Sequence, residues 1–142
     1  EIEPMGKALA TLLGTTQVFK KSEAVDGRPV TIFYSKGANG KASKMAFIES
    51  GVYQPDCAHS WAIGVNEKGA ISGVRVLAMG CPHAMPCKAS SFLDQYLGKT
   101  PADAPKLKNG INTVAKATGS SDLTTDAVVR TLTAYSKVKG KF

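Results

Sequence analysis

The chain has 142 residues, of which 43% are hydrophobic, so it is long and apolar enough for one globular domain with its own core. This composition excludes an intrinsically disordered chain, and no apolar run approaches the ~20 residues that a membrane span needs. The net charge is +7, but aromatic residues make up only 7% and no basic patch is interleaved with them, so we expect no nucleic-acid partner.

Two features point to a compartment outside the cytoplasm. The chain begins at Glu1 rather than at an initiator Met, which is typical of a protein whose signal peptide has been removed. Three cysteines in a chain of this length fit an oxidising compartment, with one disulfide and one free thiol. We therefore expect an extracytoplasmic protein, either periplasmic or facing a membrane.

The first part of the chain predicts one helix followed by strands. The helix is expected over residues 4–13, where apolar side chains share one face and Gly14 can end it. Turn signals lie at 25–29 and 36–41. Residues rich in β-branched and aromatic types predict strands over 15–20, 30–35 and 44–50.

A hairpin over residues 60–79 is the clearest predicted element. Its first arm is apolar, its turn ends at Gly69, and its second arm partly alternates. Pairing about this turn places Cys57 close to Cys81. The rest of the chain predicts a helix over 88–97, an irregular segment over 101–108, a short strand over 111–115 and an amphipathic helix over 122–138. Together these elements predict a single α+β domain over 1–142, an antiparallel sheet with helices packed on it.

A loop of small and hydroxyl-bearing residues, 117–121, is expected to lead into the last helix. Its backbone N–H groups and hydroxyls, together with the positive end of the helix behind them, would form a seat for a phosphate. Ordinary helix capping explains the same residues, because Ser and Thr are preferred at helix starts. The local sequence alone favours capping.

Three segments, in this order, resemble the FMN-binding domain found in subunits of Rnf-type electron-transport complexes and sodium-pumping quinone reductases. The first is the hairpin 61–77, whose second arm reads Ile71-x-Gly73-Val74-x-Val76-Leu77. The second is the helix over 92–99, which ends in Gly98-Lys99, and the third is the loop and helix start that reads through Ala127-Val128-Val129. The resemblance covers residues 30–138. It implies an FMN-binding-domain-like fold and an electron carrier rather than a stand-alone enzyme.

The resemblance also implies a flavin site at residues 118–125. FMN would be held there by its phosphate, covalently or non-covalently, with redox proteins as partners, among them membrane-associated ones. In the family a loop threonine often carries FMN through a phosphoester bond; here one register places Ser121 at that position, and the other places Asp122, whose carboxylate cannot play that part. The expected phosphate ligands are Thr118, Gly119, Ser120, Ser121, Leu123, Thr124 and Thr125.

After the hairpin the chain departs from the family. Where the family usually has a Glu-Thr-Pro-Gly-Leu-Gly stretch, this chain has a sulfur-rich and Pro-rich segment, 80–87. Two Cys-x-His copies, 57–59 and 81–83, are brought together by the hairpin, and Cys and His side chains in one place can bind zinc, copper or iron. The alternative function is therefore a non-flavin metal module on the same fold, with Cys57, His59, Cys81, His83 and Cys87 as its ligands.

A disulfide is the simpler explanation of the same cysteines. The two pairings considered are Cys57 with Cys81 and Cys81 with Cys87. A disulfide is compatible with a flavin site; without a flavin, the alternative function is a disulfide-stapled interaction module that docks on a partner through its basic surface.

Overall fold

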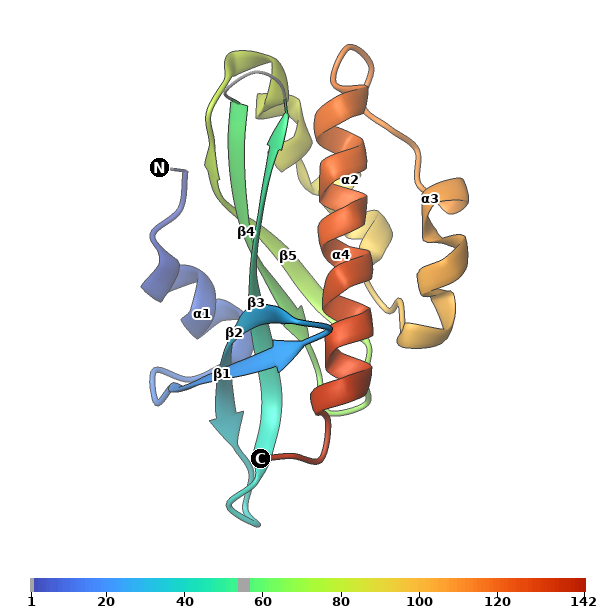
Figure 1. Ribbon diagram of the computed structural model, residues 1–142. Helices are drawn as coiled ribbons and strands as arrows, with labels where there is room; N and C mark the ends of the chain where they lie inside the picture. Colours follow the sequence, from blue (N-terminus) through green and yellow to red (C-terminus); the bar gives the residue numbers. More distant parts are fainter. Residues whose placement is uncertain (1, 54–56) are drawn as a thin grey trace.

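A computed structural model of the protein describes residues 2–53 and 57–142 (Figure 1). The described chain forms a five-stranded antiparallel sheet, in the order β1-β2-β3-β4-β5, with helices on both faces, so the α+β prediction is confirmed. The strands are β1 (Phe19–Val25), β2 (Arg28–Lys36), β3 (Ala42–Tyr53), β4 (Cys57–Val65) and β5 (Ile71–Met79). The α-helices are α1 (Met5–Leu13), α2 (Ser90–Leu93), α3 (Leu107–Gly110) and α4 (Thr118–Val138). The 3₁₀ helices are η1 (Pro82–Lys88), η2 (Asp94–Tyr96) and η3 (Pro101–Lys106).

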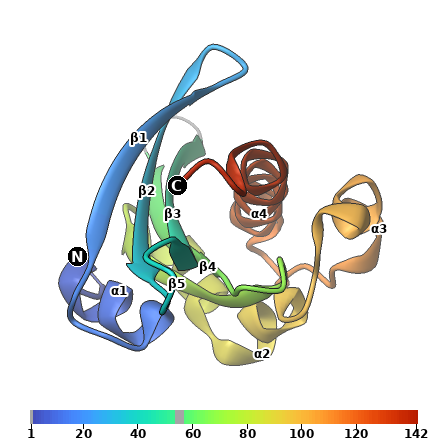
Figure 2. The ribbon, with the colours of Figure 1, turned by 90° about the horizontal axis from the view of Figure 1, so that it is seen from below.

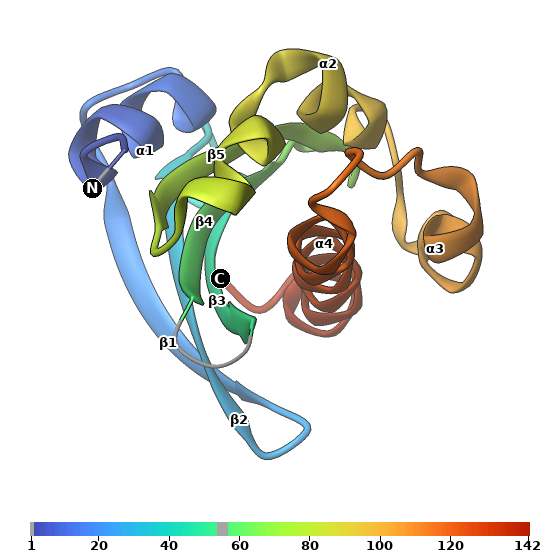
Figure 3. The same ribbon diagram turned by 90° about the horizontal axis from the view of Figure 1, so that it is seen from above.

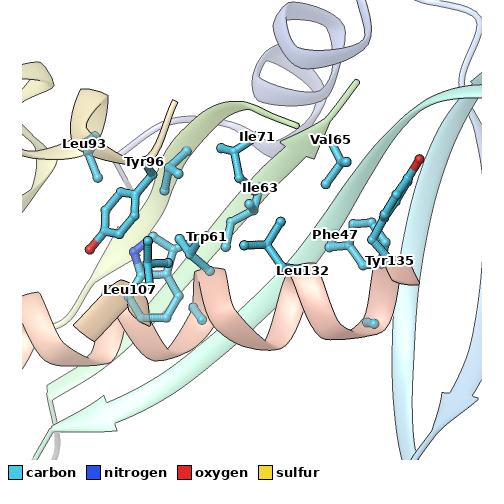
Figure 4. Packing of buried hydrophobic residues seen from close by; sticks show 14 of the residues in the cluster. Phe47, Trp61, Ile63, Val65, Ile71, Leu93, Tyr96, Leu107, Leu132 and Tyr135 are labelled. Carbon is cyan, nitrogen blue, oxygen red and sulfur yellow. The ribbon is translucent and has the colours of Figure 1, made fainter. Parts of the chain in front are cut away.

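The sheet is curved, and α4 lies in its hollow (Figure 2). Leu132 of α4 packs into the same cluster as Phe47, Trp61 and Ile63 of the sheet, and all four side chains are fully buried (Figure 4). Burying a side chain of this size stabilises the folded state by about 1.5–3 kcal/mol. The interface between α4 and the concave face is therefore the main core of the domain.

Helix α1 covers the opposite, convex face of the sheet (Figure 2). Gly64 and Gly73 allow this close approach, because a Cβ at these positions would lie 2.9 and 2.8 Å from Leu12 Cδ2. The helix ends at Gly14, whose φ of 69° is left-handed, so the predicted helix and its stop are confirmed. The residues of this smaller cluster are Ala8, Leu9, Leu12, Leu13, Ala46, Ala62 and Leu77.

Two predicted turns set the register of the sheet. The turn between β1 and β2 is Asp26–Gly27, with φ values of 53° and 78°, which suits the twist of a tight hairpin. The predicted hairpin over 60–79 is confirmed as β4 and β5, which join through a turn that ends at Gly69. The strands expected over 30–35 and 44–50 are also confirmed, and both are longer than predicted.

Several expected elements differ in the structure. The strand expected over 15–20 begins only at Phe19, because the Thr15 hydroxyl accepts a hydrogen bond from the Gln17 amide and turns the chain locally. The strand expected over 111–115 is absent, and Val114 donates its amide to the Ser121 hydroxyl instead of to a neighbouring strand. A side chain from α4 thus replaces the strand pairing that the local sequence suggested.

The region between β5 and α4 is helical in other places than predicted. The helix expected over 88–97 is a single α-turn, α2, followed by η2. The segment 101–108, expected to be irregular, contains η3 and the start of α3, because Thr100 and Asp103 form a capping box that initiates η3.

The fold also gathers aromatic and basic side chains that lie far apart in the sequence. The ring of Tyr34 lies 5.7 Å from that of Phe19 and 4.9 Å from that of Phe142, measured between centroids. Lys36 Nζ lies 4.2 Å from the centre of the Phe19 ring, and Lys21 Nζ lies 5.1 Å from that of Phe142. The sequence shows no interleaved basic and aromatic patch, whereas the sheet and the C-terminal segment create a small one.

Candidate functional site

The residues expected to bind phosphate lie in the first two turns of α4, at the end of the sheet where β3 stops and β4 starts (Figure 3). The expected loop is therefore wrong, since the helix begins at Thr118 rather than at Asp122. The hydroxyls of Ser121 and Thr124 donate to the carbonyl groups of Ala117 and Ser120, one turn earlier, at 2.8 and 2.9 Å. Because these bonds run along the helix, hydroxyl-rich residues fit a helical turn here.

Four of the expected ligand hydroxyls face the protein interior. Ser120, Ser121, Thr124 and Thr125 are each at most 5% exposed. Ser120 Oγ lies 2.9 Å from Nε2 of His59, and Thr125 Oγ1 lies 2.7 Å from the hydroxyl of Tyr96. The hydroxyls of Ser120 and Thr125 therefore tie α4 to other elements of the fold, and none of the four faces a ligand.

Neither register supports a phosphoester bond in this conformation. Ser121 is fully buried, and its hydroxyl both donates to Ala117 O at 2.8 Å and accepts from the Val114 amide at 3.0 Å. The other candidate position holds the exposed carboxylate of Asp122. The fold thus offers no accessible hydroxyl at the two positions where the family resemblance would place the ester.

The start of α4 nevertheless keeps one set of donors that suits an anion. As at any helix start, the N–H groups of Thr118, Gly119 and Ser120 have no carbonyl partner within the helix. No side chain caps this end of the helix either. Thr118 is itself exposed. The N–H of Leu123 lies in the second turn, where the helix uses it for its own bonding, so it is not such a donor.

Tyr53, at the end of β3, lies against this helix start. A Cβ at Gly119 would overlap the Tyr53 ring, so only glycine allows the ring to approach the helix so closely. Tyr53 is 49% exposed and its neighbour Val52 is 61% exposed. Sequence reasoning missed Tyr53, because nothing in the local sequence reveals that the end of β3 meets the start of α4.

A disulfide joins Cys57, at the start of β4, to Cys81, just after β5, with 5.4 Å between their Cα atoms. One of the two predicted pairings is thereby confirmed, and the pairing of Cys81 with Cys87 is wrong. Cys87 is a free, buried thiol near the Ser121 hydroxyl, at 3.5 Å, and burial raises its pKa.

His59 connects the disulfide region to α4. Its Nδ1 lies 2.9 Å from the carbonyl oxygen of Cys57, which can only accept a hydrogen bond, so Nδ1 carries a proton. When the ring is neutral, Nε2 then accepts from the hydroxyl of Ser120. His59 is 2% exposed and therefore acts as a buried link between β4 and the first turn of α4.

Three of the five proposed metal ligands, Cys57, His59 and Cys81, already have partners within the fold. The sulfurs of Cys57 and Cys81 are bonded to each other, and both ring nitrogens of His59 have partners within the fold. The side chain of His83 lies outside what the structure describes. Within the described residues, no group of three or more His, Cys, Asp or Glu side chains is arranged to hold a metal ion.

No protein-family model matches the chain, and a search of curated proteins finds no match either. The likeness to FMN-binding domains therefore depends on the segments 61–77, 92–99 and 117–129. Among the described helices, none has the length and apolar content required to cross a bilayer.

Proposed function

We propose that this protein is an extracytoplasmic electron-transfer domain that binds FMN non-covalently at the start of α4. The observation that carries this proposal is an uncapped end of a 21-residue helix beside the exposed ring of Tyr53. Such a pair offers polar donors for a phosphate and an apolar surface for a flavin ring, which are the two chemically different ends of FMN.

The phosphate end is supported by the first turn of α4. The N–H groups of Thr118, Gly119 and Ser120 point out of the helix end, where the aligned peptide dipoles favour a negative charge. The exposed hydroxyl of Thr118 adds a further donor. The net charge of +7 also favours an anionic ligand over a neutral or cationic one.

The ring end is supported by exposed apolar side chains at the same end of the sheet. The Tyr53 ring can stack on an aromatic ligand and exclude water from one of its faces. When bound, FMN would supply the electron-transfer chemistry, and the chain would contribute binding and orientation.

The disulfide supports both the compartment and the rigidity of the proposed site. Structural disulfides persist in oxidising compartments, which fits an extracytoplasmic protein. The disulfide holds the start of β4, and the His59–Ser120 hydrogen bond then ties the first turn of α4 to that strand. Partners in this proposal are redox proteins, among them membrane-associated ones.

Flavin fluorescence provides the decisive test. FMN and riboflavin, which lacks the phosphate, are titrated separately into the oxidised protein, and the quenching of flavin emission is followed. We expect saturable binding of FMN and at least about tenfold weaker binding of riboflavin, since the phosphate makes charge-assisted hydrogen bonds. Tyr53→Ala should weaken both ligands, whereas Phe19→Ala, which removes a comparably exposed ring elsewhere, should not.

Two results would overturn this proposal. One is the absence of saturable FMN binding, or equal binding of FMN and riboflavin. The other is an intact mass, measured on protein from its native host, that is increased by esterified FMN, because this would establish covalent attachment.

A further inference from the structure

A pocket lies between the turn that joins β1 to β2 and the middle of α4, away from the start of that helix. Its volume is about 260 Å³, and it is lined by Val25, Asp26, Arg28, Val129, Arg130 and Thr133. Two of these lining side chains are arginines that lie far apart in the sequence. The fold therefore builds a small pocket with two guanidinium groups in its wall.

A buried carboxylate holds both guanidinium groups in place. Glu49 of β3 has only 1% of its side chain exposed. Arg28 donates to both of its carboxylate oxygens, at 3.3 Å each, and Arg130 donates from Nε to Oε1 at 3.0 Å. Arg130 Nη2 also donates to the Ser50 carbonyl at 3.1 Å, which fixes its plane. Both arginines are thus preorganised, although 38% and 36% of their side chains remain exposed.

The charges around this pocket leave an excess of one positive charge. Glu49 neutralises one of the two arginines, and Asp26 on the rim is paired with Lys137. Each guanidinium has five N–H donors, so most of their donors remain available after the bonds to Glu49 and Ser50 are made. The exposed hydroxyl of Thr133 and the apolar side chains of Val25 and Val129 complete the wall.

We propose that this pocket is a binding site for a small oxyanion, a phosphate or carboxylate group with a single negative charge. Arginine side chains present forked donors that match the oxygen atoms of such groups. Holding both forks on a buried carboxylate reduces the entropy that the side chains lose when a ligand binds. The site is independent of the proposed flavin site, because it shares none of that site's residues.

The test measures the arginine side chains directly, so that anion binding at the start of α4 does not count. Isotope-labelled oxidised protein is titrated with inorganic phosphate near pH 6 and, separately, with acetate, at constant ionic strength. The NMR signals of the Nε–H groups of Arg28 and Arg130 should shift with saturation and a Kd of about 1–10 mM. Tighter binding of phosphate would identify a phosphate group as the ligand, and tighter binding of acetate a carboxylate.

A matched pair of variants separates this site from the general positive charge of the protein. Arg28→Lys keeps the charge that Glu49 needs but removes the fork, and we expect it to weaken binding about tenfold. Arg75→Lys is the control, because Arg75 also has 38% of its side chain exposed and also pairs with a carboxylate, that of Glu3. It should leave the affinity of the Arg28–Arg130 pocket unchanged.

Thr133→Val provides a second test that leaves the Glu49 ion pairs intact, and it should weaken binding several-fold, because it removes a hydroxyl from the wall of the pocket. The proposal is overturned if neither anion gives saturable shifts below about 50 mM. Equal weakening by Arg28→Lys and Arg75→Lys would overturn it as well. In either case the Arg28–Glu49–Arg130 network would serve only to tie the β1–β2 turn and α4 to β3.

Discussion

The two faces of the sheet are covered by helices that are held in different ways. On the convex face, α1 buries only apolar side chains, among them Leu9, Leu12 and Leu13. On the concave face, α4 buries apolar side chains together with several hydroxyls, among them Ser120 and Thr125, which bond to His59 and Tyr96. Apolar contacts favour burial without fixing a direction, whereas hydrogen bonds fix the rotation and register of a helix.

This difference bears on function because α4 carries the proposed flavin site at its start and the proposed oxyanion pocket at its middle. A helix that must present specific donors needs a fixed rotation about its own axis. Buried hydroxyl pairs fix that rotation, because their hydrogen bonds form only in a narrow range of geometries. Helix α1 presents no such group on its buried face, so apolar packing is sufficient. Substitutions on each face can test whether the two helices are held in these different ways.

Truncation of one leucine on each face compares the two apolar contributions. Leu132→Ala in α4 should lower the free energy of unfolding by about 4 kcal/mol, because a cavity forms in the middle of the main core. Leu12→Ala in α1 should cost about 2 kcal/mol, because the smaller cluster at the edge can relax around the change. Urea denaturation followed by circular dichroism measures both, and equal losses would contradict the proposed asymmetry.

Removal of the disulfide should lower the free energy of unfolding and loosen the start of β4, next to the proposed flavin site. The cysteines are separated by 24 positions, and a loop of that length predicts a loss of about 3.5 kcal/mol for the double variant Cys57→Ala/Cys81→Ala. The NMR signals of the His59 ring should change at the same time, because the strand that positions it is released. A double variant as stable as the parent protein would show that the disulfide does not stabilise the fold.

The Tyr96–Thr125 pair tests whether buried hydroxyls on α4 act as partners. Burial raises the pKa of the Tyr96 phenol, so the hydroxyl stays protonated at neutral pH. Tyr96→Phe and Thr125→Val should each cost about 1–2 kcal/mol, because each leaves a buried hydroxyl without its partner. The double variant should cost less than the sum of the two, and strict additivity in this mutant cycle would refute the pairing.

The ion pair between Glu3 and Arg75 predicts a small dependence of stability on pH. The hydrogen bonds that Arg75 donates lower the pKa of the Glu3 carboxyl below its usual 4.5, so the pair stabilises the fold above that pH and loses its effect as the pH falls through the lowered value. The effect should be below about 1 kcal/mol, because the Arg75 side chain is partly exposed to solvent. Arg75→Gln should therefore be less stable than the parent at pH 6 but equally stable near pH 2, as measured by urea denaturation at both pH values.

Local sequence patterns were sufficient to predict those elements that follow the usual helix periodicity or carry the usual turn residues. Periodicity and turn residues were enough to predict helix α1, the Asp26–Gly27 turn and the β4–β5 hairpin. The pairing of Cys57 with Cys81 was one of two alternatives, because the register of that hairpin brings the two cysteines together. These features depend on residues close together in the sequence or on a single hairpin.

The sequence by itself thus determined the α+β class and the β4–β5 hairpin, and it limited the disulfide to two candidate pairings. Only the tertiary structure decided what the hydroxyls of α4 do, because their partners His59 and Tyr96 come from other elements. The same holds for the contact of Tyr53 with Gly119 and for the Arg28–Glu49–Arg130 network. A hydroxyl or a guanidinium can face a ligand, the solvent or another side chain with the same local sequence, and long-range packing selects among these.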